Sequence, residues 1–415
     1  MASCGLDFGT SNTTLGLVRG NAPALALLEG GDVTIPSAIF FDWSARATIG
    51  RAAIAAYLEG APGRLLRSLK STLGSSLIDE ATQVGRKRLR FTEVIACYLE
   101  LVKARGEAAA GAPLTHVVHG RPVHFVDGDE AGDRKAQDAL RDIARSIGFA
   151  DVSFQFEPIA AALDYEQRVR AEEIALVIDM GGGTSDFSIV RLSPERHARA
   201  DRSADVLANS GVRVGGVDFD RRLSLETVMP LLGFRSPMKK AGVDTPSGYF
   251  HDLATWASIN RMYDPKVLRE LREVRRDSLR PDLVERLMAV VESQRGHSIA
   301  MEVEAAKISL SHAEAVSVGL GFIEGELAAT ATREDLVHAS RELTARIVAS
   351  VEACLKQAGL AARDVDALFL TGGTTQIPHV RAAVTGLLPD ARLVEGDTFG
   401  SVGMGLTIEA QRRYG

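Results

Sequence analysis

A glycine turn flanked by acidic and hydroxyl side chains is the stretch of this sequence best suited to phosphate chemistry. Residues 176–178 are an apolar run typical of a buried strand, and Asp179 ends that run. Three glycines at 181–183 follow, and their backbone N–H groups can bind phosphate oxygens because no side chain blocks the approach. Thr184 and Asp186 then add a hydroxyl and a carboxylate. A carboxylate beside such a turn can hold a hydrated cation, so this stretch predicts a metal–phosphate site.

The first residues of the chain repeat this pattern. Asp7 ends a short apolar segment, Gly9 follows it, and the hydroxyl residues Thr10 and Ser11 precede a second apolar segment. Asp7 and Asp179 lie 172 residues apart, so the chain contains two related halves. We expect the two turns to face each other and to hold the phosphates of a nucleotide from both sides. Asp7 and Asp179 would then share one hydrated magnesium ion.

Hydrophobic periodicity predicts the elements that position these residues. A strand is expected over residues 35–41, followed by a mostly helical stretch that ends at Gly74. Apolar residues recur at helical spacing over 92–110, about 130–148 and about 333–358. A buried strand is expected over 367–370.

Two charged stretches are interpreted as solvated surface elements. The basic run Arg86–Arg90 is expected to be an exposed edge or hairpin whose charges discourage aggregation. The stretch Lys266–Arg286 is expected to be an amphipathic helix with a solvated charged side.

Bulk composition narrows the class of protein. The 415 residues are 46% hydrophobic and 25% charged, as in a globular protein, and a net charge of −6 disfavours nonspecific nucleic-acid binding. The three cysteines have no paired spacing, which indicates a reducing compartment. No apolar stretch is long enough to span a membrane, and the N-terminus leaves no room for a signal peptide. We therefore expect a cytoplasmic protein, and a monomer, with no nucleic-acid or membrane partner.

Three motifs together resemble a known superfamily. Asp7-Phe-Gly9-Thr10-Ser11, the segment Asp179–Asp186, and Leu370-Thr-Gly372-Gly373-Thr374 resemble the two phosphate motifs and the adenosine motif of the actin/Hsp70/sugar-kinase superfamily. Their order and spacing most closely resemble the ATPase domain of Hsp70 chaperones, over nearly the whole chain. Among Hsp70-like proteins, the pattern looks most like the short, stand-alone bacterial proteins of the YegD type.

The resemblance implies a fold and its boundaries. The implied class is α/β, with an actin-like ATPase fold of two duplicated RNase H-like lobes around a nucleotide cleft. Lobe I would comprise residues 1–168 and 396–415, and lobe II residues 169–395. A helical insertion over about 222–300 would belong to lobe II.

The resemblance also assigns roles to residues. Lys70, Glu157 and Thr184 would orient the attacking water, and the carboxylates of Asp7 and Asp179 would bind Mg²⁺ through water. The other residues implied to bind ATP or ADP are Gly9, Thr10, Ser11, Asn12, Gly181, Gly182, Gly183, Asp186, Gly215, Gly216, Asp218, Glu304, Lys307, Ile308, Ser311, Gly372, Gly373, Thr374, Gln376 and Asp397.

The adenine end of the implied site departs from the family pattern. Ile308 and Gln376 stand where Hsp70 proteins have the two arginines that pack on the adenine, so the cation–π contribution would be absent. Val217 also replaces a glutamate of the family motif. We expect ATP to bind more weakly, or to be held differently.

The resemblance implies an ATP-binding and slowly ATP-hydrolysing molecular switch related to chaperones. The chain stops at Gly415 without the family's β-sandwich and helical lid, so no substrate-binding domain is expected. A protein client or co-chaperone is the expected kind of partner. Three alternatives stay open: a nucleotide-binding pseudo-ATPase, a small-molecule kinase and an actin-like filament protein. A P-loop enzyme is disfavoured because no G-x-x-x-x-G-K-[ST] motif occurs.

Overall fold

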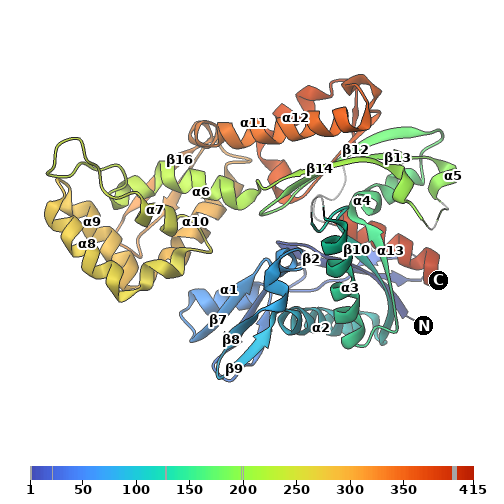
Figure 1. The fold of residues 1–415 in the computed structure, drawn as a ribbon, viewed down its shortest axis with the longest axis horizontal. Helices are drawn as coiled ribbons and strands as arrows, with labels where there is room; N and C mark the ends of the chain where they lie inside the picture. The colour runs from blue at the N-terminus through green and yellow to red at the C-terminus, as the bar shows by residue number, and fades with distance from the viewer. Residues whose placement is uncertain (1, 21, 127–128, 198, 200, 395–399) are drawn as a thin grey trace. The chain divides into compact units, whose positions relative to one another are not determined.

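The chain forms two compact units in a computed structural model that describes all residues except 1, 21, 127–128, 198, 200 and 395–399. Unit 1 comprises Met1–Gly211, Ser350–Gly373 and Leu387–Gly415. Unit 2 comprises Val212–Ala349 and Thr374–Gly386. Figure 1 traces both units from the N-terminus to the C-terminus. The predicted lobes I and II divide the chain at other residues than these two units, and the lobe boundaries stay a prediction.

Unit 1 contains two sheets with the same strand pattern. The first sheet has the order β11-β10-β1-β2-β3, and the second has the order β14-β13-β12-β17-β18. In each sheet the central strand pairs antiparallel with the next strand in sequence and parallel with a later one. The first-sheet strands are β1 (Ala2–Phe8), β2 (Asn12–Arg19), β3 (Ala22–Leu25), β10 (Leu114–Arg121) and β11 (Asp151–Phe156), and β4 (Thr34–Pro36) pairs with β2. The second-sheet strands are β12 (Glu173–Met180), β13 (Ser185–Leu192), β14 (Val206–Val212), β17 (Ala367–Thr371) and β18 (Arg392–Val394).

This repeated order confirms the duplication that the spacing of the two aspartates predicts, and with it the α/β class and the actin-like fold. β1 and β12 are the central strands, and Asp7 and Asp179 lie at equivalent places near their carboxyl ends. In open α/β sheets, ligands bind beyond the carboxyl ends of the parallel strands. Both aspartates therefore stand where a ligand is expected.

Helices cover the sheets because alternate strand residues are apolar. Cys4, Leu6 and Phe8 of β1 are buried in a core that includes α2 (Phe91–Ala110) and α3 (Glu130–Ser146). A second core joins β12 and β17 to α4 (Glu157–Glu166) and α13 (Ser401–Tyr414). The helices predicted over 92–110 and about 130–148 are thus confirmed.

A smaller sheet in unit 1 corrects one prediction. The stretch between residue 42 and Gly74 was expected to be mostly helical, but it contains two strands and a single α-helix. Positive φ angles at Gly50 and Gly60 bound that helix, and the central strand β5 pairs on both sides. The elements are β5 (Ala38–Asp42), β6 (Ala47–Ile49), α1 (Arg51–Leu58), β7 (Gly63–Arg67), and the 3₁₀ helices η1 (Leu69–Thr72) and η2 (Ser76–Asp79).

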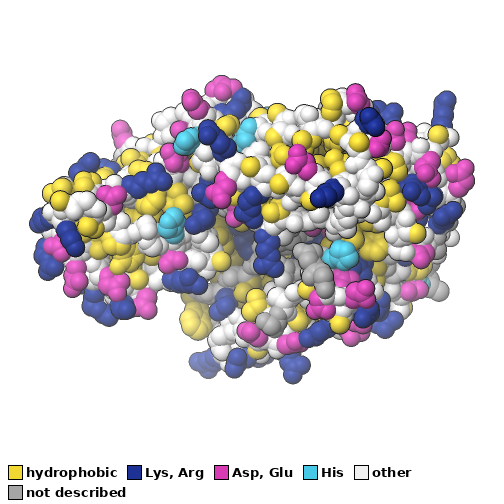
Figure 2. Space-filling view, turned by 45° about the horizontal axis from the view of Figure 1, so that its top comes forward, with side chains coloured by type: hydrophobic (Ala, Val, Ile, Leu, Met, Phe, Trp, Pro, Cys, Tyr) yellow, Lys and Arg dark blue, Asp and Glu magenta, His cyan; other side chains and the backbone are white. Residues whose placement is uncertain are grey.

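The basic run forms the hairpin that its charges predict. β8 (Ala81–Val84) and β9 (Lys87–Arg90) make a two-stranded sheet, and the basic side chains of the run are exposed. Figure 2 shows Lys and Arg side chains interspersed with Asp and Glu side chains over the face drawn. The mixture is typical of a solvated surface. Among the described residues, every helix is too short or too polar to span a bilayer.

Unit 2 is mostly helical, as the predicted insertion over about 222–300 requires. The expected continuous helix over Lys266–Arg286 is wrong, because the chain breaks at Ser278 and Pro281 begins a new helix. The elements from residue 216 to residue 309 are α6 (Gly216–Thr227), η4 (Met229–Leu232), α7 (Gly248–Leu253), η5 (Ile259–Tyr263), α8 (Pro265–Asp277), α9 (Pro281–Glu292) and α10 (Gly296–Ser309).

The later elements complete the two units. α11 was expected over about 333–358 and spans Arg333–Ala358. It is preceded by the hairpin β15 (Ala315–Gly319) and β16 (Ala328–Thr332), and η7 (Gly373–Gln376) leads into α12 (Pro378–Leu387). The remaining short elements are α5 (Pro194–His197), η3 (Ser203–Asp205) and η6 (Ala362–Asp364).

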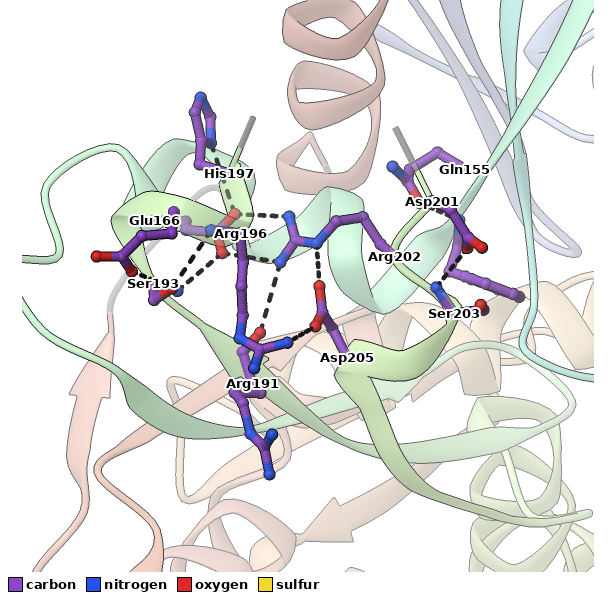
Figure 3. Close-up of polar contacts among 12 residues, drawn as sticks. Gln155, Glu166, Arg191, Ser193, Arg196, His197, Asp201, Arg202, Ser203 and Asp205 are labelled. Atoms are coloured by element: carbon purple, nitrogen blue, oxygen red, sulfur yellow. Dashed lines mark hydrogen bonds and ion pairs between the residues drawn. The ribbon is translucent and has the colours of Figure 1, made fainter. Parts of the chain in front are cut away.

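A buried ion-pair cluster ties the last turn of α4 to the segment between β13 and β14 (Figure 3). Glu166 accepts hydrogen bonds from both terminal nitrogens of Arg202, each at 2.8 Å. Asp205 accepts from Arg202 and from Arg196, and Ser193 N donates to Glu166 at 3.1 Å. The side chains of Glu166, Arg202 and Asp205 are at most 2% exposed. The cluster therefore fixes the C-terminal end of α4, and Glu157 is at the N-terminal end of the same helix.

Replacing Arg202 by methionine is expected to lower the free energy of unfolding by about 3–5 kcal/mol, because Glu166 would stay buried without its arginine and Asp205 would keep only Arg196. Arg134→Met is the matched control, since the Arg134 side chain is 69% exposed and its partner Glu130 is 92% exposed. The control should change stability by less than about 1 kcal/mol. Urea denaturation of both variants measures the free energies of unfolding. Equal losses of stability in the two variants would show that burial does not make the cluster more stabilising than an exposed ion pair.

Candidate active site

Two backbone turns with the same geometry open the site in unit 1. The N–H of Gly9 donates to the carbonyl of Asn12, and the N–H of Gly181 donates to the carbonyl of Thr184, each at 3.0 Å. The two hydrogen bonds occupy equivalent positions of the duplicated hairpins β1–β2 and β12–β13. The phosphate-type turn is therefore duplicated in three dimensions as well as in sequence.

The two turns approach each other closely. A Cβ atom at Gly182 would lie 2.2 Å from Ser11 Oγ, so any larger residue would force the Ser11 hydroxyl to move. The first turn is held by Ser37, whose hydroxyl donates to the carbonyl of Gly9 at 2.7 Å and whose N–H donates to the carbonyl of Ser11 at 2.8 Å. Ser37 was not foreseen from the sequence. The turns at residues 9–12 and 181–184 are together called the cradle below.

Replacing Gly182 by alanine is expected to weaken nucleotide binding about tenfold, because the new methyl group must displace the Ser11 hydroxyl from the cradle. Gly386→Ala is the matched control, since a Cβ at this exposed glycine of α12 has no neighbour within 4 Å and lies outside the turns. Calorimetric titration of both variants with ADP measures the difference. Equal affinities of the two variants would mean that the approach of the turns does not matter for binding.

An ion pair lies next to the two aspartates. Lys70 Nζ is 2.5 Å from Glu157 Oε1, and each side chain is 12% exposed. Lys70 lies in η1, which begins after Ser68 in a left-handed conformation with φ of 57°. Glu157 is the first residue of α4, and Pro158 follows it in the first turn, where proline is favoured. Two residues 87 positions apart are thus brought into direct contact.

The local electrostatics show an excess of negative charge. Burial, then repulsion from Glu157, raises the pKa of Asp7 to about 8. The same two causes raise the pKa of Asp179 to about 6. Burial alone would lower the pKa of Lys70, but attraction to Glu157 and Asp7 outweighs it and raises the pKa. Three carboxylates therefore share the influence of one ammonium group.

This donor set fits a hydrated magnesium ion. Hard carboxylate oxygens are the ligands that Mg²⁺ prefers, and the ion usually keeps several of its waters. Within the described part of the chain, no three His, Cys, Asp or Glu side chains converge closely enough to hold a metal by themselves. Asp7 and Asp179 would hold the ion through water, and its charge would offset their repulsion.

A small cavity adjoins the ion pair. Its volume is about 20 Å³, enough for about one water molecule. Glu157, Pro158, Asp179 and Asp186 line it, together with residues 122–123. Thr184 donates weakly to Asp186 at 3.4 Å. A water in this cavity would lie beside the carboxylate of Glu157.

Two glycines make room for the acidic groups. A Cβ at Gly372 would lie 2.7 Å from Asp179 Oδ1, and this residue has φ of 82°, a conformation that favours glycine. A Cβ at Gly120 would lie 3.3 Å from Glu157 Cγ. The structure places Gly372 against the Asp179 carboxylate, and its predicted contact with adenosine stays a prediction. Gly120 was missed, and only its place at the end of a strand could have indicated it.

The residues predicted to contact adenosine lie mostly in unit 2. Lys307 is buried, its Nζ is 2.8 Å from Asp220 Oδ1, and it donates to the carbonyl of Gly216 at 3.3 Å. The N–H of Gly215 donates to Asp218 Oδ2 at 2.9 Å, at the start of α6. The Lys307 pair therefore joins α10 to the glycine turn of α6.

Burial is what the structure describes for several other predicted binding residues. Ile308 is 58% exposed, as a residue covering a bound base would be in the absence of the base. Glu304, Ser311 and Gln376 are half-buried, and Thr374 is buried. Gly373 ends the part of unit 1 that follows β17. Their roles stay predictions, and Asp397 lies outside the described residues.

The repeated sheets, the paired turns and the adjacent Lys–Glu pair define a protein of the actin-like ATPase fold. The family model described as Hsp70 protein matches residues 3–229 and 266–409, and the chain therefore belongs to the Hsp70 family. The chain is similar to two curated proteins described as "Chaperone protein HscA homolog", from Aromatoleum aromaticum and from Azoarcus sp.. Each is 27% identical over 98% of this chain, which spans 57% of the relative's length. The stretch between the two matched ranges lies in the helical part of unit 2.

Proposed function

We propose that this chain binds ATP with Mg²⁺ and hydrolyses it slowly, and that the nucleotide state acts as a molecular switch in chaperone-related work. The observation that carries the proposal is the meeting of two identical glycine turns beside the Lys70–Glu157 pair. Membership of the Hsp70 family supports the same nucleotide.

The residues of unit 1 have complementary tasks in this proposal. The N–H groups of Gly182, Gly183 and Thr184 and the hydroxyls of Thr10 and Ser11 bind the β- and γ-phosphates, while the N–H of Gly181 closes the turn on the carbonyl of Thr184. Mg²⁺, held through water by Asp7 and Asp179, supplies charge neutralisation for the phosphates. Phosphoryl transfer depends mainly on positioning and charge, so few other groups are required.

Lys70 and Glu157 act at the attacking end. The Lys70 ammonium stabilises the negative charge that develops on the γ-phosphate. Glu157 accepts a hydrogen bond from the attacking water and so fixes its orientation. Thr184, at the end of the second turn, helps to place the same water. The 2.5 Å contact between Lys70 Nζ and Glu157 Oε1 holds these two charged groups in one arrangement.

Two further features belong to the proposal. An exposed Ile308 in place of a stacking arginine supports weak or altered adenine binding. Both relatives are described as chaperone proteins, which supports a protein client or co-chaperone as the partner. We propose a monomeric, cytoplasmic protein of this kind, closest in pattern to the YegD type.

Phosphate release from Mg-ATP by the purified chain, measured with ATP affinity, tests the function. Slow release that depends on Mg²⁺ supports the switch. Tight binding without release would replace it by a pseudo-ATPase. Release only with an added sugar acceptor would indicate a kinase, and nucleotide-dependent light scattering would indicate a filament.

A further inference from the structure

We infer that Arg121 is a positioning residue that holds Glu157 in its place beside Lys70. The inference rests on the proposed hydrolysis of ATP. Arg121 is the last residue of β10, and its side chain is 11% exposed. It does not contact the two turns or the two aspartates in any hydrogen bond or ion pair that the described residues form. Its effect is therefore exerted through its neighbours.

Arg121 first fixes the loop that follows it. Its Nε donates to the carbonyl of Pro122 and one terminal nitrogen donates to the carbonyl of Val123, each at 2.9 Å. Pro122 and Val123 line the cavity beside Glu157 and Pro158. A buried guanidinium that bonds two consecutive carbonyls holds that loop in one conformation. One wall of the cavity is thus set by Arg121.

Arg121 also fixes the residue before Glu157. The guanidinium lies over the ring of Phe156, 5.2 Å from its centroid, and over the ring of Phe125 at the same distance. Phe156 pairs with Arg121 across β10 and β11 and is followed directly by Glu157. The stacking therefore restrains the chain where it turns from β11 into α4.

The guanidinium is itself held from α3. Asp133 accepts from Arg121 at 2.6 Å, and Gln137 accepts from the other terminal nitrogen. Asp133 also accepts from the N–H of Phe125 at 2.5 Å, which ties the loop to the same carboxylate. Because Asp133 neutralises the charge of Arg121, the arginine acts by geometry and contributes little field at the phosphates.

The test compares Arg121→Met with Arg141→Met in single-turnover hydrolysis and in ATP affinity. Arg141 of α3 is the matched control. Its guanidinium lies 5.2 Å from the ring of Phe154, which is on β11 like Phe156, and it pairs with Asp138, away from the loop. Arg121→Met is expected to slow hydrolysis about tenfold to a hundredfold with little change in affinity, because a small misplacement of Glu157 suffices. Arg141→Met is expected to hydrolyse like the wild type. Equal rates for the two variants would overturn the inference.

A double variant separates positioning from an independent role. In the Glu157→Gln background, Arg121→Met is expected to cause no further loss, since its target is already removed. Multiplying losses would overturn the inference. Arg121→Lys, which keeps the charge near Asp133 but not the bonds to the loop, should be slowed nearly as much as Arg121→Met. A rate like that of the wild type would show that only the charge matters.

A readout without hydrolysis distinguishes failure of this inference from failure of the proposed function. If the wild type does not hydrolyse ATP, the proposed function fails, and the contact between Lys70 and Glu157 can still be compared in crystal structures of wild type and Arg121→Lys. Loss of the contact in the variant supports the positioning role. A retained contact with an unchanged loop overturns it.

Discussion

Replacing Lys70 by alanine is expected to slow ATP hydrolysis about a hundredfold to a thousandfold while ATP affinity changes only a few-fold. The ammonium group acts on charge that develops during the reaction, so its loss affects the transition state more than the bound nucleotide. Without it, Glu157 also loses the partner that holds it at 2.5 Å. Single-turnover phosphate release and calorimetric titration with ATP measure the two effects separately.

Lys103→Ala is the matched control for this experiment. The Lys103 side chain is also 12% exposed and also forms an ion pair with a glutamate, Glu107, at 2.6 Å, but both residues lie on α2. The control removes a half-buried lysine of the same exposure and should leave the rate of hydrolysis unchanged. If both variants hydrolyse at the same rate, Lys70 has no special part in the reaction.

Replacing Asp7 by asparagine is expected to stabilise the nucleotide-free protein and to weaken its response to Mg-ATP. The pKa of Asp7 is about 8 in the folded protein, chiefly because of burial and then repulsion from Glu157, against an ordinary value of 3.8. Between these values the folded protein binds a proton that the unfolded chain has released, so the wild type loses stability as pH rises toward 8. Asparagine keeps the shape without the charge, so the gain is expected to be about 1–3 kcal/mol at pH 7.5 and smaller near pH 4.

Thermal unfolding with and without Mg-ATP checks both parts of this prediction. Added Mg-ATP should raise the melting temperature of Asp7→Asn less than that of the wild type, because one carboxylate that holds the hydrated ion is gone. Asp42→Asn is the control, and it should lower the melting temperature of the nucleotide-free protein, since a hydrogen bond from Ser44 lowers the pKa of Asp42. A nucleotide-free Asp7→Asn that melts below the wild type at pH 7.5 would contradict the argument.

The two glycine turns of the cradle were predictable because their signals are local. An apolar run, an aspartate and a glycine turn identify each hairpin, and the repeat of Asp7 at Asp179 identifies the duplication. The structure confirms both the hairpins and the repeated strand order. The signal for each hairpin lies within about a dozen residues, where backbone preferences act directly.

The acidic side of the site was less predictable because it is made by long-range pairing. Nothing near Lys70 in the sequence indicates Glu157, and only the resemblance to Hsp70 joined them. Gly120 and Arg121 gain their roles because β10 lies between β1 and β11, an order that the sequence does not state. The expected helix between β5 and Gly74 was wrong for the same reason, since β6 and β7 are strands by virtue of pairing with β5.

The close packing of α13 against the first strands has a consequence for synthesis. A Cβ at Gly405 would lie 1.8 Å from the carbonyl oxygen of Ala160, and one at Gly5 would lie 2.3 Å from the N of Thr407. The first hairpin and α4 therefore have their final neighbour only after residues near 407 have left the ribosome. Until then these apolar surfaces stay uncovered on a nascent chain made at about 5–20 residues per second. The earliest strands of the chain therefore gain their packing partner α13 only after residues 401–414 have been made.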